Sequence, residues 1–120
     1  MGKEHRLTKS TEFAKVIKYG NSWSNSLLIL KAYATNEEKT RCGFSVSRKV
    51  GNAVVRNKVK RRLREITRLT PLEEGWDLVI ICKKWAGLAK FSLLHSSLTN
   101  LFDRANIRLG SKNYFIKETQ

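Results

Sequence analysis

The first apolar residues of the chain follow a helical spacing. Phe13, Val16 and Ile17 recur at positions i, i+3 and i+4, so they form one stripe on a helix. Ser10 is a good residue for the N-terminal cap of this helix, and Gly20 is a typical residue for its end. The pattern therefore predicts a short first helix between Ser10 and Gly20.

Two strands are predicted next, over residues 27–34 and 42–49, after a segment at 21–26 that is typical of a turn. Alternate side chains of a strand share a face. On the first strand, one face therefore carries Leu27, Ile29, Lys31 and Tyr33. On the second strand, Phe44 and Val46 lie on one face, and Ser45 and Ser47 lie on the other. We therefore expect one face of the sheet to be partly open and polar.

A long helix is predicted after the second strand. Asn52 is a good N-cap, and the helical pattern continues to about Leu69, before Pro71 and Gly75 interrupt it. Its apolar stripe consists of Val55, Val59, Leu63 and Ile66. The helix therefore has one stripe for the core and a polar remainder.

The last third of the chain predicts one more strand and one more helix. Residues 76–83 contain five apolar residues in a row, as expected for a central strand. Residues 90–106 carry an apolar helix face made of Phe91, Leu94, Leu98, Leu101, Phe102 and Ala105. The element order is αββαβα, which predicts an α+β or α/β fold, a single sheet with helices packed on it. Its strand–helix–strand unit would ordinarily be right-handed.

Length and charge narrow the class of protein. The 120 residues fit one domain, in which we expect a basic arm at 1–9 and a polar tail at 108–120 to be flexible. The 24 Lys and Arg against 10 Asp and Glu give a net charge of +14, which attracts polyanions. The longest apolar stretches, 27–30 and 78–82, are far shorter than the ~20 residues of a membrane span. Because the N-terminus also lacks a signal-peptide pattern, we expect a cytoplasmic protein that binds nucleic acid.

Residues that support hydrolysis or metal binding in proteins are scattered along this sequence. Cys42 and Cys82 each lie in an apolar, strand-like run, which favours buried core residues over a disulfide or a zinc site. His5 and His95 are far apart, and no pair of carboxylates suggests a two-metal centre. We therefore predict no catalytic residue and no metal ligand in the protein itself.

More than half of the positive charge lies in residues 48–68. This segment has nine Lys and Arg residues and one acidic residue, Glu65, a net charge of +8 out of +14. On a helix Arg56, Lys60 and Arg64 stack along one flank. A solvated helix face usually mixes acids with bases, whereas a row of like charges repels itself unless anions neutralise it. We interpret this helix as a surface that binds a polyanion.

The segment VSRKVGNAVVRNKVKRRLRE closely resembles the signature of the protein subunit of bacterial ribonuclease P, in which an Arg-Asn-Arg run follows a K-x-G-N-A motif. RLTKSTEFAKVIKYGNS, RCGFSVSRK and WDLVIICKK match as well, so the resemblance covers roughly residues 6–105. Two positions depart from the family. Lys58 replaces the second Arg of the run and lacks its bidentate fork. Arg62 stands on the apolar stripe, so it must snorkel or the helix must sit slightly rotated.

The resemblance implies a ribonucleoprotein in which a catalytic RNA subunit removes the 5′ leader of precursor tRNA. The chemistry would belong to the RNA, with Mg²⁺ held mainly by the RNA subunit and the substrate. The protein, monomeric on its own, would bind both the RNA subunit and precursor tRNA, and neither a membrane nor DNA. The resemblance also implies an α+β fold of the α/β sandwich type, with a single mixed sheet packed by helices. Its βαβ crossover would be left-handed in place of the right-handed default.

Residue roles are carried over from the family position by position. Contacts with the precursor tRNA leader fall on Phe13, Ile17, Lys31, Arg56, Asn57 and Lys60, and the open strand faces add Tyr33, Ser45 and Ser47. Contacts with the RNA subunit fall on Arg48, Lys49, Asn52, Lys58, Arg61 and Arg64. Ile17 and Lys31 replace residues that are aromatic in some relatives, so Tyr33 would compensate for lost base stacking.

Several alternatives stay open at the level of sequence. Phe13 is as consistent with the core as with a leader cleft, Asn52 has a competing role as N-cap, and Trp23, Trp76 and Trp85 are interpreted as packing or rim residues. The composition also fits a ribosomal or other structural RNA-binding protein. A helix-turn-helix DNA regulator fits poorly, because a strand and not a helix precedes the basic helix.

Overall fold

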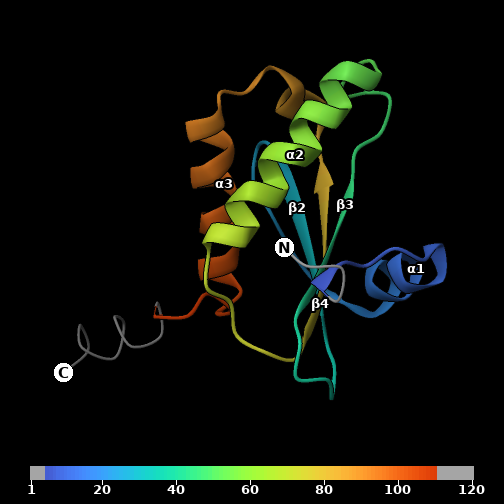
Figure 1. Cartoon of the computed structure of the whole chain (residues 1–120), viewed down its shortest axis with the longest axis vertical. Coiled ribbons are helices and arrows are strands. Elements are labelled where there is room, and N and C mark those ends of the chain that lie inside the picture. The colour runs from blue at the N-terminus through green and yellow to red at the C-terminus, as the bar shows by residue number, and fades with distance from the viewer. Residues whose placement is uncertain (1–4, 111–120) are drawn as a thin grey trace.

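The computed structural model describes residues 5–110 (Figure 1). The elements are α1 (Ser10–Tyr19), β1 (Asn21–Ser24), β2 (Leu28–Ala34), β3 (Arg41–Ser45), α2 (Ala53–Leu69), β4 (Trp76–Cys82), the 3₁₀ helix η2 (Lys84–Leu88) and α3 (Phe91–Arg104). The strands form one sheet in the order β1-β2-β4-β3. Only β3 and β4 are parallel, so the predicted α+β fold with a single mixed sheet is confirmed.

The crossover from β3 to β4 is left-handed. Figure 1 shows both strands pointing up, with the chain leaving β3, descending through α2 on the viewer's side and returning in β4 to the left of β3. A right-handed crossover would place β4 to the right. The handedness implied by the family resemblance is therefore correct, and the general default for such units does not hold here.

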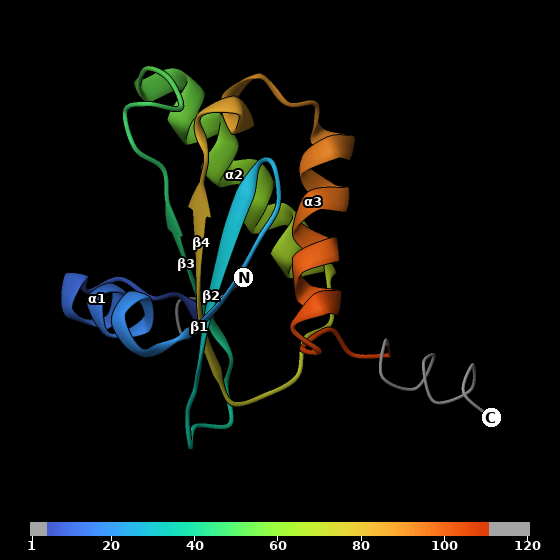
Figure 2. The same cartoon turned by 180° about the vertical axis from the view of Figure 1, so that it is seen from behind.

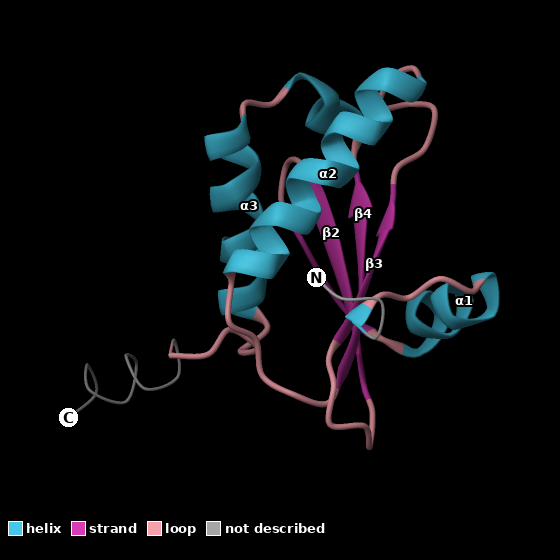
Figure 3. Cartoon of the chain, in the orientation of Figure 1, coloured by secondary structure: helices cyan, strands magenta, loops and turns pink. Residues whose placement is uncertain are grey.

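Helices cover both faces of the sheet. The main core lies between the sheet and the helices α2 and α3, where Figure 3 shows α2 crossing in front of the strands with α3 beside it. A smaller cluster on the other face joins Leu7, Val16 and Val79 under α1. Figure 2 shows the sheet between α1 on one side and α3 on the other. Helix α2 buries Val59, Leu63 and Ile66, as its predicted stripe requires.

Three local predictions are corrected. Residues 21–24 form β1, which pairs antiparallel with β2, although their polar sequence was interpreted as a turn. Strand β3 ends at Ser45 and not near residue 49, because the backbone turns where the N–H of Val50 donates to the carbonyl of Ser47. The N-cap of α1 is Lys9 and not Ser10, since the carboxylate of Glu12 accepts the backbone N–H of Lys9 at 3.1 Å.

The start of α3 is partly exposed, and hydrogen bonds attach both ends of the described chain to the fold. Phe91, predicted on the apolar face of α3, is 39% exposed because it is the first residue of that helix. The N–H of Leu7 donates to the carbonyl of Cys42, and that of Leu109 to the carbonyl of Pro71, so both ends are held to the fold at these points. Residues 1–4 and 111–120, part of the predicted flexible arm and tail, lie outside the described residues. No helix in residues 5–110 is both long and apolar enough to span a bilayer.

Candidate nucleic-acid interface

The register of the sheet defines three rows of side chains on its α1 face. Across β2, β4 and β3 the rows are Tyr33, Asp77 and Arg41, then Lys31, Val79 and Gly43, then Ile29, Ile81 and Ser45. In the middle row Val79 is fully buried and Gly43 lies beneath Phe13, so α1 covers it. In the third row all three residues are half-buried, so none of them is fully covered. We call Ile29, Ile81 and Ser45 the open row; with Lys31 beside it, it is the accessible part of this sheet face.

Phe13 divides its ring between packing and the surface. A Cβ on Gly43 would lie 2.4 Å from Cζ of Phe13, so the tip of the ring rests on the backbone of β3. The ring packs with Val16 and Val79 but remains only half-buried. Ile17, one helical turn further along α1, is 42% exposed. The absence of a side chain at Gly43 therefore fixes where Phe13 sits.

The polar residues of the strands that were predicted to contact RNA differ in their exposure and in the contacts they already make. Lys31 and Tyr33 are half-buried on β2, but Nζ of Lys15 lies 5.1 Å from the centroid of the Tyr33 ring, within range of a cation–π contact. One face of Tyr33 is thus covered, which leaves less stacking surface than the sequence suggested. Ser45 belongs to the open row, whereas Ser47 lies exposed beyond the end of β3.

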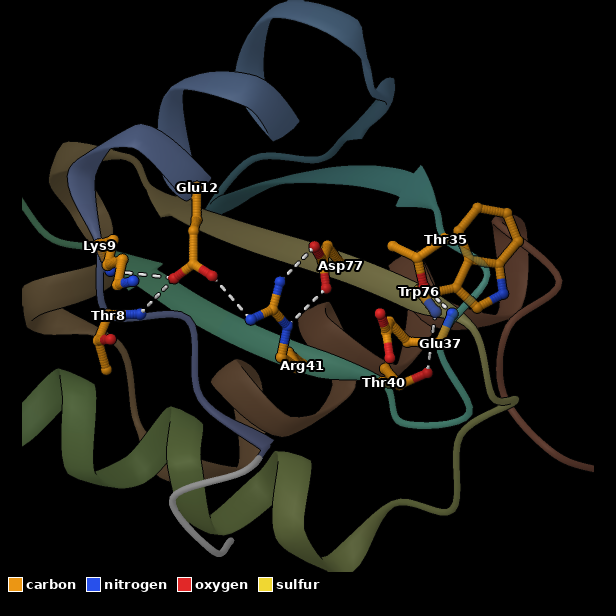
Figure 4. Close-up of polar contacts among 9 residues, drawn as sticks. All are labelled: Thr8, Lys9, Glu12, Thr35, Glu37, Thr40, Arg41, Trp76 and Asp77. Carbon is orange, nitrogen blue, oxygen red and sulfur yellow. Dashed lines mark hydrogen bonds and ion pairs between the residues drawn. The ribbon is translucent and has the colours of Figure 1, made fainter.

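A three-residue ion network anchors α1 to the sheet (Figure 4). Arg41 of β3 donates from Nε to Oδ1 of Asp77 at 3.0 Å and from Nη2 to Oδ2 at 2.8 Å. Its Nη1 donates to Oε2 of Glu12 in α1 at 2.7 Å. We call these three residues the Arg41 clamp. Because it joins α1 to β3 and β4, the clamp helps to hold Phe13 over Gly43, next to the open row.

The clamp stabilises the ionised form of the Glu12 carboxylate at neutral pH. The backbone N–H of Lys9 and the guanidinium of Arg41 donate to Glu12 and lower its pKa below the ordinary value of 4.5, while Asp77 and Glu12 raise the pKa of Arg41. Since the folded-state pKa of Glu12 is lowered, its contribution to stability is present above pH 4.5 and is lost as the pH falls through the lowered value. No local sequence pattern predicts this network; its one signal is an acid, Asp77, within an otherwise apolar strand.

Helix α2 presents a row of basic side chains without acidic partners. Within the described residues, none of Arg56, Lys60, Arg61 or Arg64 forms an ion pair, whereas Arg68 pairs with Glu65 at 2.7 Å. Arg56, Lys60 and Arg64 are half-buried, so their stems lie against the protein. Nε of Arg56 is buried with no hydrogen-bond partner. Such a row favours an anionic ligand, which supplies the missing acceptors and relieves the mutual repulsion.

Two polar residues in and beside α2, Asn52 and Arg62, already form hydrogen bonds within the protein. Oδ1 of Asn52 accepts the N–H of Val55 at 3.0 Å, so Asn52 is the N-cap of the helix. Arg62 snorkels, as one of the two alternatives predicted: its Nη1 reaches the carbonyl of Ala89 at 3.2 Å. Asn57, Lys58, Arg48 and Lys49 are exposed.

The predicted leader residues fall into two groups on opposite sides of the sheet. Phe13, Ile17, Lys31, Tyr33 and Ser45 belong to α1 and the sheet face that it covers, whereas Arg56, Asn57 and Lys60 belong to α2, which packs on the other face. The turn at 46–51, which carries Ser47, links the two groups at the end of β3. A ligand that touches both groups must therefore pass around this end of the sheet.

The two cysteines are core residues, as predicted. Both are free and buried, and burial raises the pKa of each thiol to about 12, so both thiols stay protonated at neutral pH. Trp23 and Trp76 pack against the core, while Trp85 is exposed. No group of three His, Cys, Asp or Glu side chains within residues 5–110 is placed to hold a metal ion.

Binding of RNA to this surface is expected to depend steeply on salt. Neutralising about eight phosphates gives a log–log slope of the association constant against salt concentration of roughly −5 to −7, because each neutralised phosphate releases condensed counterions. Filter binding of a structured RNA between low and moderate salt measures the slope. A slope shallower than about −2 would mean that the basic row of α2 is not the contact surface.

The family model and the curated relatives that this chain matches all carry the name ribonuclease P. The family model for Ribonuclease P matches residues 1–106. The "Ribonuclease P protein component" of Dehalococcoides mccartyi strain CBDB1 is 40% identical over 107 residues, covering 89% of each chain. The protein of the same name from Clostridium kluyveri is 39% identical over 107 residues, covering 86% of this chain and 96% of the relative.

Solved structures agree in fold. A Staphylococcus aureus RNase P protein mutant described as having defective mRNA degradation activity superimposes with a TM-score of 0.81 at 30% identity, over 88% of this chain and 91% of its own. The RNase P protein of Thermotoga maritima superimposes with a TM-score of 0.73 at 32% identity, over 82% of this chain and 96% of its own.

Proposed function

The chain belongs to the ribonuclease P protein family, and we propose that it acts with a catalytic RNA subunit that cleaves precursor tRNA and releases the 5′ leader. The family makes it a component of an endoribonuclease that processes tRNA, which sets aside the ribosomal alternative. A DNA regulator is disfavoured as well, because β3 directly precedes the basic helix. The observation that carries the proposal is the unpaired basic row of α2.

Two sets of residues would divide the RNA contacts. For the RNA subunit we assign the outer surface of α2 and the turn before it, namely Arg48, Lys49, Asn52, Lys58, Arg61 and Arg64. Exposed guanidinium and ammonium groups neutralise phosphates there without reading sequence. Asn52 would contribute mainly by capping the helix and fixing the direction of its N-terminal end.

The leader would bind along the open row. Phe13 and Ile17 would form one wall, with the apolar side chains of Ile29 and Ile81 as the floor and Lys31, Tyr33, Ser45 and Ser47 as polar contacts. A base can stack on the exposed part of Phe13, because stacking tolerates any base. Arg56, Asn57 and Lys60 would then bind leader phosphates beyond the turn at 46–51.

The carboxylates near this surface do not fit a protein-held Mg²⁺. Both oxygens of Asp77 and both oxygens of Glu12 already accept hydrogen bonds, from Arg41 and from the backbone of Thr8 and Lys9. A cation at the same place would be repelled by Arg41. We therefore assign Mg²⁺ to RNA phosphates, outside this protein, and expect the protein to act by docking the substrate.

Reconstitution tests the proposal. The purified protein alone is expected to leave precursor tRNA intact, and site-specific cleavage at the 5′ end is expected when ribonuclease P RNA from the same organism and Mg²⁺ are added. The measurement is gel analysis of end-labelled precursor tRNA at low Mg²⁺, with RNA alone as the control. Cleavage by rigorously RNA-free protein, or no gain over RNA alone, would contradict the proposal.

A further inference from the structure

The 3₁₀ helix η2 turns its large apolar side chains outward. Its inner side consists of small residues: Ala86 is fully buried, and a Cβ on Gly87 would lie 2.3 Å from the carbonyl oxygen of Val50. Its outer side carries Trp85, which is 57% exposed, and Leu88, which is 81% exposed. The small residues allow close packing against the body, and the large ones are left with no intramolecular core to join.

The 3₁₀ helix η2 lies against the first turns and the middle of α2. The Cβ position on Gly87 is 3.1 Å from Cγ1 of Val55, and Nη1 of Arg62 donates to the carbonyl of Ala89. Figure 2 shows η2 beside α2 at the end of the molecule away from the C-terminus of α3. Exposed large apolar side chains gather at this end, and we call the set the η2 patch: Val54, Trp85, Leu88 and Phe91.

The η2 patch lies in a strongly positive field. The patch residues lie in two stretches of the chain, 41–64 and 78–102, that contain no Asp or Glu. Exposed cations surround the patch, namely Lys49, Lys58, Lys84 and Lys90. Nζ of Lys84 lies 4.7 Å from the centroid of the Trp85 ring and covers part of one face, as Lys15 does on Tyr33, but Trp85 remains 57% exposed. Four acidic residues instead lie in loops 35–40 and 70–75, away from the patch, so the molecule is electrically asymmetric.

An exposed aromatic residue in a positive field fits single-stranded nucleic acid. Bases stack on aromatic rings whatever their identity, and lysines at the rim bind the flanking phosphates. A second copy of this chain would bring the same cations face to face, which disfavours self-association through the patch. The charge complementarity therefore selects an RNA partner.

We propose that the η2 patch is a second RNA contact, in which Trp85 stacks on a base of an unpaired nucleotide in ribonuclease P RNA. Lys84 and the neighbouring lysines bind the phosphates beside that nucleotide. The inference rests on the proposed partnership with ribonuclease P RNA, but it is independent of the leader assignment, because η2 and α1 lie on different parts of the molecule. It adds an anchoring residue that no motif of the family singled out.

The test measures the dissociation constant of the full-length protein for ribonuclease P RNA from the same organism. Trp85→Ala is expected to weaken binding roughly five- to hundredfold, the range for loss of one stacked base, whereas Trp85→Phe keeps an aromatic ring and should stay within about threefold of the unaltered protein. Tyr19→Ala is the matched control, because Tyr19 is 63% exposed and also carries a lysine, Lys18, 5.2 Å from its ring centroid. That variant should bind ribonuclease P RNA normally.

Two further readouts separate this contact from folding and from substrate binding. Trp85 is solvent-exposed, so Trp85→Ala and Leu88→Ala should melt like the unaltered protein, and the ratio of affinities for precursor and mature tRNA should not change. Tryptophan emission should be quenched on RNA binding, and Trp85→Phe should lose most of that quenching. If the unaltered protein fails to bind ribonuclease P RNA at all, the proposed function is wrong.

The η2 patch proposal is wrong if Trp85→Ala binds ribonuclease P RNA as the unaltered protein does. It is equally wrong if Trp85→Ala leaves RNA binding intact but abolishes self-association in sedimentation, or abolishes binding to vesicles of anionic phospholipid. Those outcomes would assign the patch to a second copy of the chain or to a membrane surface.

Discussion

Replacing Asp77 with alanine is expected to lower the free energy of unfolding by about 3 kcal/mol. The change removes both acceptors of a bidentate contact with Arg41, and the Asp77 side chain is only 10% exposed. Arg41 would be left with Glu12 alone in a partly buried site, where an unpaired cation is unfavourable. This loss of unfolding free energy is at the low end for a broken buried ion pair, because the Arg41 side chain is 30% exposed and water can reach it. Urea denaturation followed by circular dichroism measures the change.

Controls for this prediction come from the same chain. Arg68→Met breaks the exposed pair with Glu65 on α2 and should leave the unfolding midpoint nearly unchanged, because solvent and salt screen such pairs. The double variant Asp77→Leu with Arg41→Met replaces the pair by apolar residues and should be more stable than Asp77→Ala. It leaves only Glu12 without its ion partner, and that carboxylate still accepts the backbone N–H groups of Thr8 and Lys9. If Asp77→Ala and Arg68→Met had equally small effects, the clamp would be no more than another surface ion pair.

The helices could be predicted from the sequence because their signals are local. The i, i+3, i+4 spacing of Val59, Leu63 and Ile66 and the N-cap Asn52 specify α2 without knowledge of the rest of the fold. β1 could not be predicted in the same way. Its residues are polar, and Asn21–Ser24 is extended only because it pairs with β2 across a tight connection.

The candidate site was predicted less completely, because it depends on long-range pairing. The alternation of β2 correctly put Ile29, Lys31 and Tyr33 on one face. Leu27, predicted on the same face, precedes the strand and is buried in the main core instead. Whether that face is open depends on where α1 lies, which follows from the contact of Phe13 with Gly43 and from the Arg41 clamp. Both join segments about 30 residues apart, and no local pattern encodes them.

The resemblance to the ribonuclease P family supplied what the local physics left open. The handedness of the β3–α2–β4 unit is the clearest example, because the general rule for such units gives the opposite answer. The residues themselves supplied the charge argument, since nine bases with one acid in residues 48–68 already indicated a polyanion. The two sources are complementary: the family fixes topology and partner, and the residues show which atoms are free to bind.

Replacing Phe13 with alanine is expected to reduce discrimination between precursor and mature tRNA roughly five- to hundredfold, the effect of one lost stacked base. Precursor tRNA carries leader bases and mature tRNA does not, so only the precursor loses affinity. The measurement is the ratio of the two dissociation constants with the reconstituted holoenzyme. Because Phe13 also packs on Gly43, this variant should unfold at a lower temperature too.

Phe13→Leu separates stacking from packing in this prediction. Leucine retains most of the apolar contact with Val16 and Val79 but has no ring on which a base can stack. If Phe13 binds the leader, Phe13→Leu should melt close to the unaltered protein and still lose most of the discrimination. If Phe13 is only a core residue, Phe13→Leu should keep the affinity ratio, and Phe13→Ala should lower the melting temperature without changing that ratio. The latter pair of results would remove Phe13 from the leader site and leave the open row without its aromatic wall.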